Sequence, residues 1–246
     1  MTRTRQQAIS RHIRERIQDG TYPPGSKIPA IPALMEEFEV ARETVREAVA
    51  RLAHEGLVTP LQGIGTIVRD ATTVEMAYRP DRPAQVWSVK TGETEDSDRV
   101  VQAGWETATR EITSWLQIPD RAQVLHRVRH QRKGGQIAQI HEQWIPNDLA
   151  RAIQDATGDD LTDTARPLST DLFSQMRAAG DGPATVTETT TARMPDPDEA
   201  GTLELPPGVP VLVLWRITRN TDERPLETSI LVGASDRISH SYTVPV

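Results

Sequence analysis

The hydrophobic and polar residues between positions 42 and 54 follow a helical period. Apolar side chains recur at i, i+3, i+4 and i+7, and they are Val45, Ala48, Val49 and Leu52. That spacing predicts a helix with one buried stripe. The residues between the stripe positions, which we expect to face outward, are Arg42, Thr44, Arg46 and Glu47. Such a helix buries one side and presents two arginines from its first turns on the other.

Similar patterns flank this helix on both sides. Residues 6–19 form an amphipathic helical pattern that ends at Gly20. A shorter apolar pattern at residues 34–38 predicts another helix, and two short β-prone runs follow at 57–59 and 66–68. Three helices followed by a hairpin make a winged helix-turn-helix, in which the third helix suits the major groove of DNA.

The charge of the chain is distributed unevenly. The 246 residues have a formal net charge of -7. Residues 1–70 contain ten Lys/Arg and nine Asp/Glu, a net charge of +1, so the remainder carries -8. A net charge of +1 is a weak electrostatic footprint for DNA. The placement of individual arginines must therefore matter more than bulk charge, and the acidic remainder would repel non-specific DNA.

Several classes of site and location are excluded by composition. The chain has no cysteine, which rules out disulfides, thiolate metal sites and cysteine nucleophiles. The N-terminal residues lack the apolar core of a signal peptide, and no run approaches the roughly 20 apolar residues of a membrane span. We expect a cytoplasmic protein that does not enter a membrane. No pattern indicates a metal ligand set, a cofactor or a catalytic residue, so none is predicted.

Beyond the hairpin the pattern changes character. We interpret the polar, turn-rich residues 70–83 as a linker that joins a domain at 1–69 to a second domain at 84–246. In the second domain an apolar period over 101–116 predicts a helix. The other predicted strands are 84–89, 124–132, 137–145, 184–193 (an exposed edge), 209–220 and 225–232, and the other predicted helices are 148–155, 171–179 and 198–203. Returning strands with helices gathered on one side indicate an α+β domain.

Three motifs in the first domain occur in the order and spacing of a known family. PPGSKIP precedes the second helix, VARETVREAVARLAHEGLV spans the third, and GIGTIV lies in the hairpin. Across about residues 6–68 the chain resembles the DNA-binding domain of the GntR family of bacterial transcription regulators. The resemblance implies that Arg42, Thr44 and Arg46 lie at the DNA. It also implies that the tip with Gly63 and Gly65 reaches toward the minor groove, where glycine permits close backbone approach.

The chain departs from the family pattern at two helix starts. A serine usually precedes the second and the third helix, whereas Ala30 and Ala41 stand here. Loss of an N-cap hydroxyl costs roughly 1 kcal/mol of helix stability, so we expect the fold to survive and the DNA affinity to differ. Apart from the resemblance, the two arginines would be interpreted as a solvated helix face paired with neighbouring glutamates, and the glycines as a plain hairpin turn.

Four pieces of the second half match another domain. They lie at residues 128–146, 192–200, 208–216 and 224–237. Together they resemble the UTRA effector-binding domain across about residues 105–242, a domain that is similar to the chorismate-lyase fold and binds small, often anionic metabolites. The fold class is then α+β, with an N-terminal winged helix-turn-helix followed by an antiparallel-sheet UTRA domain, in the HutC-like branch of the GntR family.

The resemblance assigns five effector-binding residues, which are Arg129, Gln131, His141, Ser169 and Glu227. Arg129 matches an arginine that holds the ligand's anionic group, and Ser169 precedes a helix N-terminus that suits an anion. Gln131 replaces a family arginine and His141 a family glutamate, so we expect a ligand other than a sugar phosphate. From the residues alone, an internal salt bridge is the alternative for Arg129 and Glu227, and His141 is better interpreted as a histidine on a strand face.

Two classes of function compete on this evidence. The first is a homodimeric repressor that binds a double-stranded DNA operator and releases it when a small-molecule effector binds. A variant of this class is a repressor with a degenerate pocket and no ligand, as on mobile elements. The second is a lyase-like enzyme with a DNA-binding head. No general acid/base pair or nucleophile constellation appears, so the sequence favours the repressor.

Overall fold

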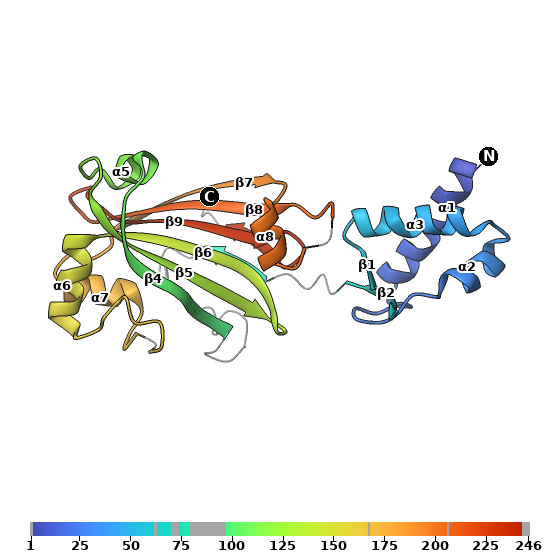
Figure 1. Cartoon of the computed structure of the whole chain (residues 1–246), viewed down its shortest axis with the longest axis horizontal. Helices are drawn as coiled ribbons and strands as arrows, with labels where there is room; N and C mark the ends of the chain where they lie inside the picture. The colour runs from blue at the N-terminus through green and yellow to red at the C-terminus, as the bar shows by residue number, and fades with distance from the viewer. Residues whose placement is uncertain are drawn as a thin grey trace. The chain divides into compact units, whose positions relative to one another are not determined.

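The computed structural model describes residues 2–61, 63–69, 74–78, 97–166, 168–205 and 207–242. Its helices are α1 (Thr2–Gln18), α2 (Ile31–Phe38), α3 (Arg42–His54), α5 (Arg110–Leu116), α6 (Asn147–Thr157), α7 (Leu172–Ala178) and α8 (Pro197–Thr202). Its strands are β1 (Val58–Leu61), β2 (Gly65–Val68), β3 (Val74–Tyr78), β4 (Asp98–Thr107), β5 (Gln123–Lys133), β6 (Gln136–Pro146), β7 (Thr185–Arg193), β8 (Val211–Arg219), β9 (Pro225–Ala234) and β10 (Ile238–Tyr242) (Figure 1). One compact unit comprises 1–73, 194–210 and 235–237, and a second comprises 74–193, 211–234 and 238–246.

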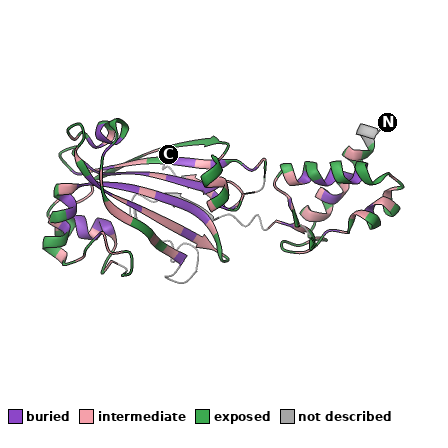
Figure 2. Ribbon diagram, in the orientation of Figure 1, coloured by how far each residue is buried: buried purple, intermediate pink, exposed green. Residues whose placement is uncertain are grey.

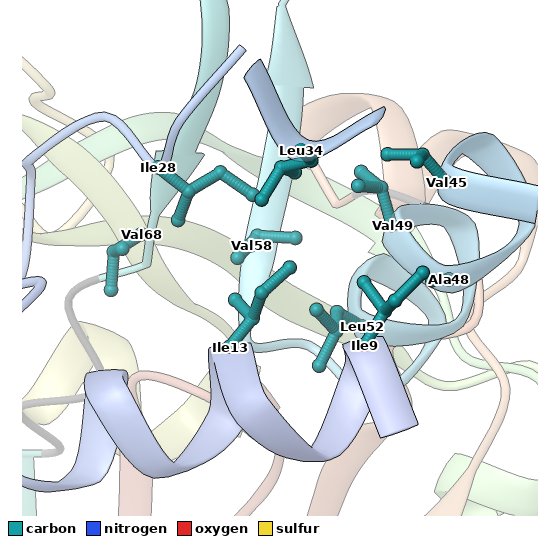
Figure 3. Packing of buried hydrophobic residues seen from close by; sticks show 10 residues of the cluster. All are labelled: Ile9, Ile13, Ile28, Leu34, Val45, Ala48, Val49, Leu52, Val58 and Val68. Atoms are coloured by element: carbon teal, nitrogen blue, oxygen red, sulfur yellow. The ribbon is translucent and has the colours of Figure 1, made fainter. Parts of the chain in front are cut away.

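The first unit contains a three-helix domain with a two-stranded hairpin. Side chains from all three helices and both strands meet in one apolar cluster, shown in Figure 3, of Ile9, Ile13, Ile28, Leu34, Val45, Ala48, Val49, Leu52, Val58 and Val68. All four stripe positions predicted on α3 belong to it. Strands β1 and β2 are antiparallel, with Val58 opposite Val68. The predicted winged helix-turn-helix is confirmed.

Both helices of the helix-turn-helix begin without a side-chain cap. The N-cap residues are Ala30 for α2 and Ala41 for α3, and neither side chain accepts a hydrogen bond from the first turn. Helix α2 ends at Glu39, whose left-handed φ of 50° turns the chain toward α3. Because a methyl side chain satisfies none of the free N–H groups of a first turn, packing into the apolar cluster holds these helices in place.

The second unit is built on a six-stranded sheet with the strand order β4-β5-β6-β9-β8-β7. Every neighbouring pair is antiparallel. Helices α6 and α7 pack on Leu125 and Ile145, while α5 packs on Val124 and Trp144 (Figure 1). Successive side chains of a strand point to opposite faces, so these helices cover the two faces of one sheet. The α+β prediction for this half is confirmed, but the expectation that the helices gather on one side of the sheet is wrong.

The helix predicted over residues 101–116 is wrong in its first half. Those residues begin within β4, an edge strand paired with β5, and only α5 is helical. Val101 and Trp105, two of the apolar positions behind the prediction, are 49% and 44% exposed. A β-bulge early in β4 shifts its register, which disturbs the alternation that would have indicated a strand. Long-range pairing with β5 therefore overrides the local period.

The other predicted elements of the second domain agree with the structure. Strand β7 is the exposed edge, whereas β6 and β9 are buried along most of their length (Figure 2). Strand β3 lies inside the predicted linker and pairs in parallel with β10, and the sequence patterns predicted neither strand. The predicted strand at 84–89 lies outside the described residues. The boundaries at 69, 83 and 84 stay predictions.

Candidate functional sites

The outward side of α3 carries two exposed arginines. Arg42 and Arg46 lie in its first turns, with side chains in solvent. The Arg46 side chain is 62% exposed, and its Nη1 lies 3.9 Å from Glu43 Oε2. A surface ion pair of this kind contributes little free energy, so it would yield readily to a phosphate or a base edge. The opposite side of α3 is fixed in the apolar cluster, which determines where both arginines point.

Thr44 does not share this exposed surface. It is 7% exposed, so the prediction that its side chain faces outward is wrong. Thr44 lies four residues before Ala48 and is therefore on the same side of the helix as the apolar stripe. Burial of its hydroxyl and methyl groups makes it part of the scaffold that supports the arginines.

The wing has the predicted glycine-rich tip. Gly63 and Gly65 adopt positive φ angles of 75° and 122°, a region that glycine enters without steric cost. Ile64 between them is 55% exposed. Lys27, which the sequence analysis missed, forms an antiparallel bridge with Ile67 beside this tip. Lys27 is exposed next to the wing, so it is a candidate for contact with a DNA phosphate, and its position in the PPGSKIP motif could have indicated it.

A second group of polar side chains lies on one face of the six-stranded sheet. Strand β5 presents alternate residues, and each has a partner directly opposite on β6: Arg127 with Gln143, Arg129 with His141, and Gln131 with Gln139. The same face continues across β9 and β8. We call this set the polar face: Arg127, Arg129, Gln131, Gln139, His141, Gln143, Arg216, Thr218, Glu227 and Ser229. All of these except Arg129 and Arg216 are buried.

Arg129 is engaged in an internal salt bridge. Its Nε donates to Asp98 Oδ1 at 3.0 Å and its Nη2 donates to Asp98 Oδ2 at 2.7 Å. Gln131 Nε2 donates to Asp98 Oδ2 as well, at 3.3 Å. Arg129 therefore forms an internal salt bridge with Asp98, and its role in effector binding stays a prediction. A guanidinium fork that is already filled is less available to a ligand than a free one.

Glu227 and His141 also lie on the polar face, but they differ in their hydrogen bonding. Glu227 is 1% exposed and accepts hydrogen bonds from Thr218 Oγ1 at 2.8 Å and from Gln143 Nε2. Burial lowers the pKa of His141 well below its ordinary value of 6.5, and the neighbouring arginines, Arg129 foremost, lower it further. His141 is therefore neutral at physiological pH, and its Nε2 has no partner among the described residues.

Ser169 is not brought together with the other predicted effector residues. It is exposed, and its hydroxyl donates to Asp159 Oδ2 at 2.6 Å. This contact and the Ser169 backbone hydrogen bond lower the pKa of Asp159. The N-terminus of α7 is capped by the Asp171 side chain. Within the described residues, Ser169 therefore serves its own loop and is the one predicted effector residue that does not lie on the polar face.

Arg127 is one of the polar-face residues that the sequence analysis did not name. It is 1% exposed, and neither its Nε nor its Nη1 has a partner in the described part of the chain. Burial, with a contribution from Arg129, lowers its pKa to about 10, although Asp98 and Glu227 act to raise it. The guanidinium therefore remains charged at neutral pH. Strand alternation places residues 127, 129 and 131 on one face, and that period could have identified it.

Other features of the described residues are outside these two sites. No described helix has the length and apolarity to cross a bilayer, and no three described His, Asp or Glu side chains are grouped as metal ligands would be. A surface hollow of about 420 Å³ lies at the end of α5, the start of α6 and the β8–β9 turn. Its Arg224 is already paired with Asp148 and Asp181.

Comparison with known families identifies both halves of the chain. Residues 5–68 match the gntR family of bacterial regulatory proteins, and residues 97–239 match the UTRA domain. The chain belongs to the GntR family. The winged helix-turn-helix is its DNA-binding domain, and the six-stranded sheet with its polar face is its effector domain.

GntR-family relatives match most of the chain. An HTH-type transcriptional regulator of Streptomyces coelicolor is 30% identical, over 94% of this chain and 89% of its own length. The crystal structure of a GntR-family transcriptional regulator has a TM-score of 0.60 and 25% identity, with 98% of each chain covered. The mannosyl-D-glycerate transport/metabolism system repressor of Escherichia coli K12 is 31% identical, over 56% of this chain and 57% of its own length. The protein is thus a GntR-family transcriptional regulator.

Proposed function

We propose that this regulator is a repressor whose binding to its operator is relieved by a small-molecule effector at the polar face. One observation carries the proposal: the chain combines exposed arginines on α3 with a buried polar face on which several atoms have no partner among the described residues. The first arrangement suits an extended polyanion such as DNA. The second suits a small molecule that displaces water and pairs with buried groups.

Arg42 and Arg46 are the proposed groups for the major groove. Recognition helices reach base edges with residues near their N-terminal end, which is where both arginines lie on α3. Gly63 and Gly65 would let the wing tip approach the minor groove, and Lys27 would contact a phosphate. Base contacts give specificity and phosphate contacts give position, so these groups have separate tasks.

The effector and the operator would oppose each other through a coupling free energy of about 1–3 kcal/mol. We propose a homodimer, because a two-fold protein matches an operator with two half-sites. The E. coli relative named as a repressor supports the choice of repression over activation. The effector domain supports the HutC-like branch of the family, and access to the chromosome requires a cytoplasmic location.

Arg46→Ala tests the DNA-binding half of the proposal. If Arg46 reads a base edge, the variant should bind the specific operator more weakly by about 1–3 kcal/mol. Gel shift on DNA that flanks the protein's own gene measures this change. Arg110→Ala, at an exposed arginine of α5, is the matched control and should bind as the wild type does. Unchanged affinity of Arg46→Ala would contradict the placement of α3 in the groove.

The same gel shift, repeated with a panel of metabolites, tests the effector half. Release of the operator by one metabolite supports ligand-relieved repression. An operator complex that no metabolite weakens favours the variant with a degenerate pocket. Turnover of a metabolite by the purified protein would favour the lyase-like alternative.

A further inference from the structure

The polar face has more buried hydrogen-bonding capacity than its own residues use. Among the described residues, its atoms without a partner are Arg127 Nε and Nη1, Gln131 Oε1, Gln139 Nε2, His141 Nε2, Gln143 Oε1 and Ser229 Oγ. Buried polar atoms are almost always satisfied in folded proteins. We propose that the effector is a polyhydroxylated monocarboxylate of the sugar-acid class, whose carboxylate binds Arg127. This inference rests on the proposed effector function of the polar face.

The pairing of charges singles out Arg127 as the anion-binding group. Arg129 is bound by Asp98, and Arg216 donates from Nε at 2.9 Å and Nη2 at 2.6 Å to Glu188 Oε1. Of these three arginines, Arg127 is the most deeply buried, and the described residues give its guanidinium no such pairing. A buried charge without a counter-ion is strongly disfavoured, so an anion gains most at Arg127.

The charges of the polar face also limit the ligand to one negative charge. Glu227 lies two residues along β9 from Ser229, which shares a row of the polar face with Gln143 and hence with Arg127. A phosphate ester carries close to two negative charges at neutral pH. Among the described residues of the polar face it would meet one arginine without a salt bridge, with the buried carboxylate of Glu227 nearby. A carboxylate carries a single charge and matches two donors of the guanidinium fork.

The neutral groups favour hydroxyls elsewhere on the ligand. The three carboxamides and Ser229 can each donate or accept, and the assignment of amide oxygen and nitrogen can interchange. Neutral His141 offers one further donor or acceptor at Nε2. A hydroxyl group both donates and accepts, so adjacent hydroxyls would satisfy this mixed surface. An apolar ligand would leave the same atoms buried and unpaired.

The area of the unpartnered atoms sets the size of the ligand. Arg127 and Gln131 are four residues apart on β5, a span of about 13 Å at the usual rise of a strand. Across β5, β6 and β9, the row from Arg127 through Gln143 to Ser229 spans about 10 Å. A footprint of this size fits one or two sugar residues and exceeds a simple short-chain acid.

Binding of gluconate and lactobionate to the full-length protein tests the ligand class. These are sugar acids of one and two sugar residues, and sorbitol and lactitol are polyols that match them without the carboxylate. We expect calorimetry to give at least tenfold tighter binding for one acid than for its polyol. No binding of either acid, equal binding of acid and polyol, or tighter binding of glucose 6-phosphate than of both acids would overturn the proposal.

Variants at the two central arginines test the anchor. Arg127→Gln should weaken acid binding at least tenfold, and Arg127→Lys should recover part of that loss because it keeps the charge. Arg110→Gln, on the side of the sheet opposite the polar face, is the control for a surface arginine, and circular dichroism checks the fold of each variant. If Arg129→Gln abolished binding while Arg127→Gln did not, Arg129 would be the anchor and the proposal would be wrong.

Operator release separates this inference from the proposed function. Acids that bind through Arg127 without weakening the operator complex would support the ligand class and contradict ligand-relieved repression. Release of the operator by a phosphate ester or an uncharged metabolite, with no response to the acids, would contradict the ligand class and support the repressor. Release by a sugar acid, lost in Arg127→Gln, would support both.

Discussion

The two proposed sites keep their charged side chains in opposite environments. Arg42 and Arg46 lie in solvent on a helix that an apolar cluster holds from its other side. Arg127 and Glu227 are each 1% exposed within a sheet. A solvated charge costs little to keep, whereas a buried charge costs several kcal/mol unless it is paired. The stability of the DNA-binding face therefore depends on the apolar cluster beneath it. The stability of the polar face depends on whether each buried polar group has a partner.

The largest expected effect concerns the scaffold of the DNA-binding face. Leu52 is completely buried in the apolar cluster, so Leu52→Ala should destabilise the winged helix-turn-helix by about 2–5 kcal/mol. Amide hydrogen exchange of α1 to α3 in the full chain measures this local stability. Leu61→Ala, at a leucine of β1 that is 41% exposed, should change it by no more than about 0.5 kcal/mol. Equal effects at both leucines would refute the assigned core.

A substitution on the polar face is expected to raise the stability of the protein, whereas Leu52→Ala lowers it. Arg127 is buried, and the described residues give its guanidinium no salt bridge, although Asp98 and Glu227 act on its charge from a distance. Arg127→Met, which keeps an apolar stem, should therefore stabilise the ligand-free protein by about 1–3 kcal/mol. Urea unfolding without ligand, followed by the tryptophans of the sheet domain, measures this gain. Arg129→Met should instead destabilise, because it leaves Asp98 buried without its partner. A loss of stability in Arg127→Met would mean that its charge is compensated.

A smaller gain is expected at the start of the recognition helix. Ala41→Ser restores an N-cap hydroxyl to α3 and should stabilise the DNA-binding domain by about 1 kcal/mol. Hydrogen exchange of the first turn of α3 reports the change. The same substitution at exposed Ala50, within the helix, should cost a few tenths of a kcal/mol. If Ala41→Ser gave no protection, packing alone would determine where the helix begins.

Histidines on the two faces of the sheet should change the folding stability with pH in opposite directions. These are the smallest of the expected effects. His141 is neutral in the folded protein because burial, then Arg129 and its neighbours, lower its pKa well below 6.5. The unfolded chain binds a proton there more readily, so stability is complete above about 6.5 and is lost as the pH falls below it. His141→Gln should flatten this acid-side loss in unfolding experiments between about pH 5 and 7. An unchanged slope would mean that His141 is already protonated.

His126, on the other face, has the reverse sign. It stacks on Trp144, its Nδ1 lies 3.2 Å from Glu106, and its Nε2 lies 3.1 Å from Glu142. Burial acts to lower its pKa, but the two carboxylates raise it above 6.5. Its contribution to stability is full below 6.5 and is lost as the pH rises through the folded pKa. His126→Gln should remove that loss, and a pH profile identical to wild type would contradict the ion pairs.

The sequence predicted the DNA-binding face better than the polar face for a physical reason. The period of Val45, Ala48, Val49 and Leu52 determines one buried side within a single helix, so it carries over directly into the structure. In the sheet the partners are distant in sequence. Whether Arg129 or Arg127 is free depends on Asp98, which reaches Arg129 only because β4 pairs with β5.

Local sequence alone therefore determined the winged helix-turn-helix, its exposed arginines, its glycine-tipped wing and most strands of the effector domain. Only the tertiary structure decided that residues 98–107 form an edge strand and that Ser169 lies away from the polar face. Helical stripes and hairpin turns are set by neighbours within a few residues. Which buried charges are paired, and which polar atoms are left without a partner, depends on strands that are distant in the sequence and adjacent in the sheet. No short stretch of sequence contains both members of an ion pair such as Asp98 and Arg129.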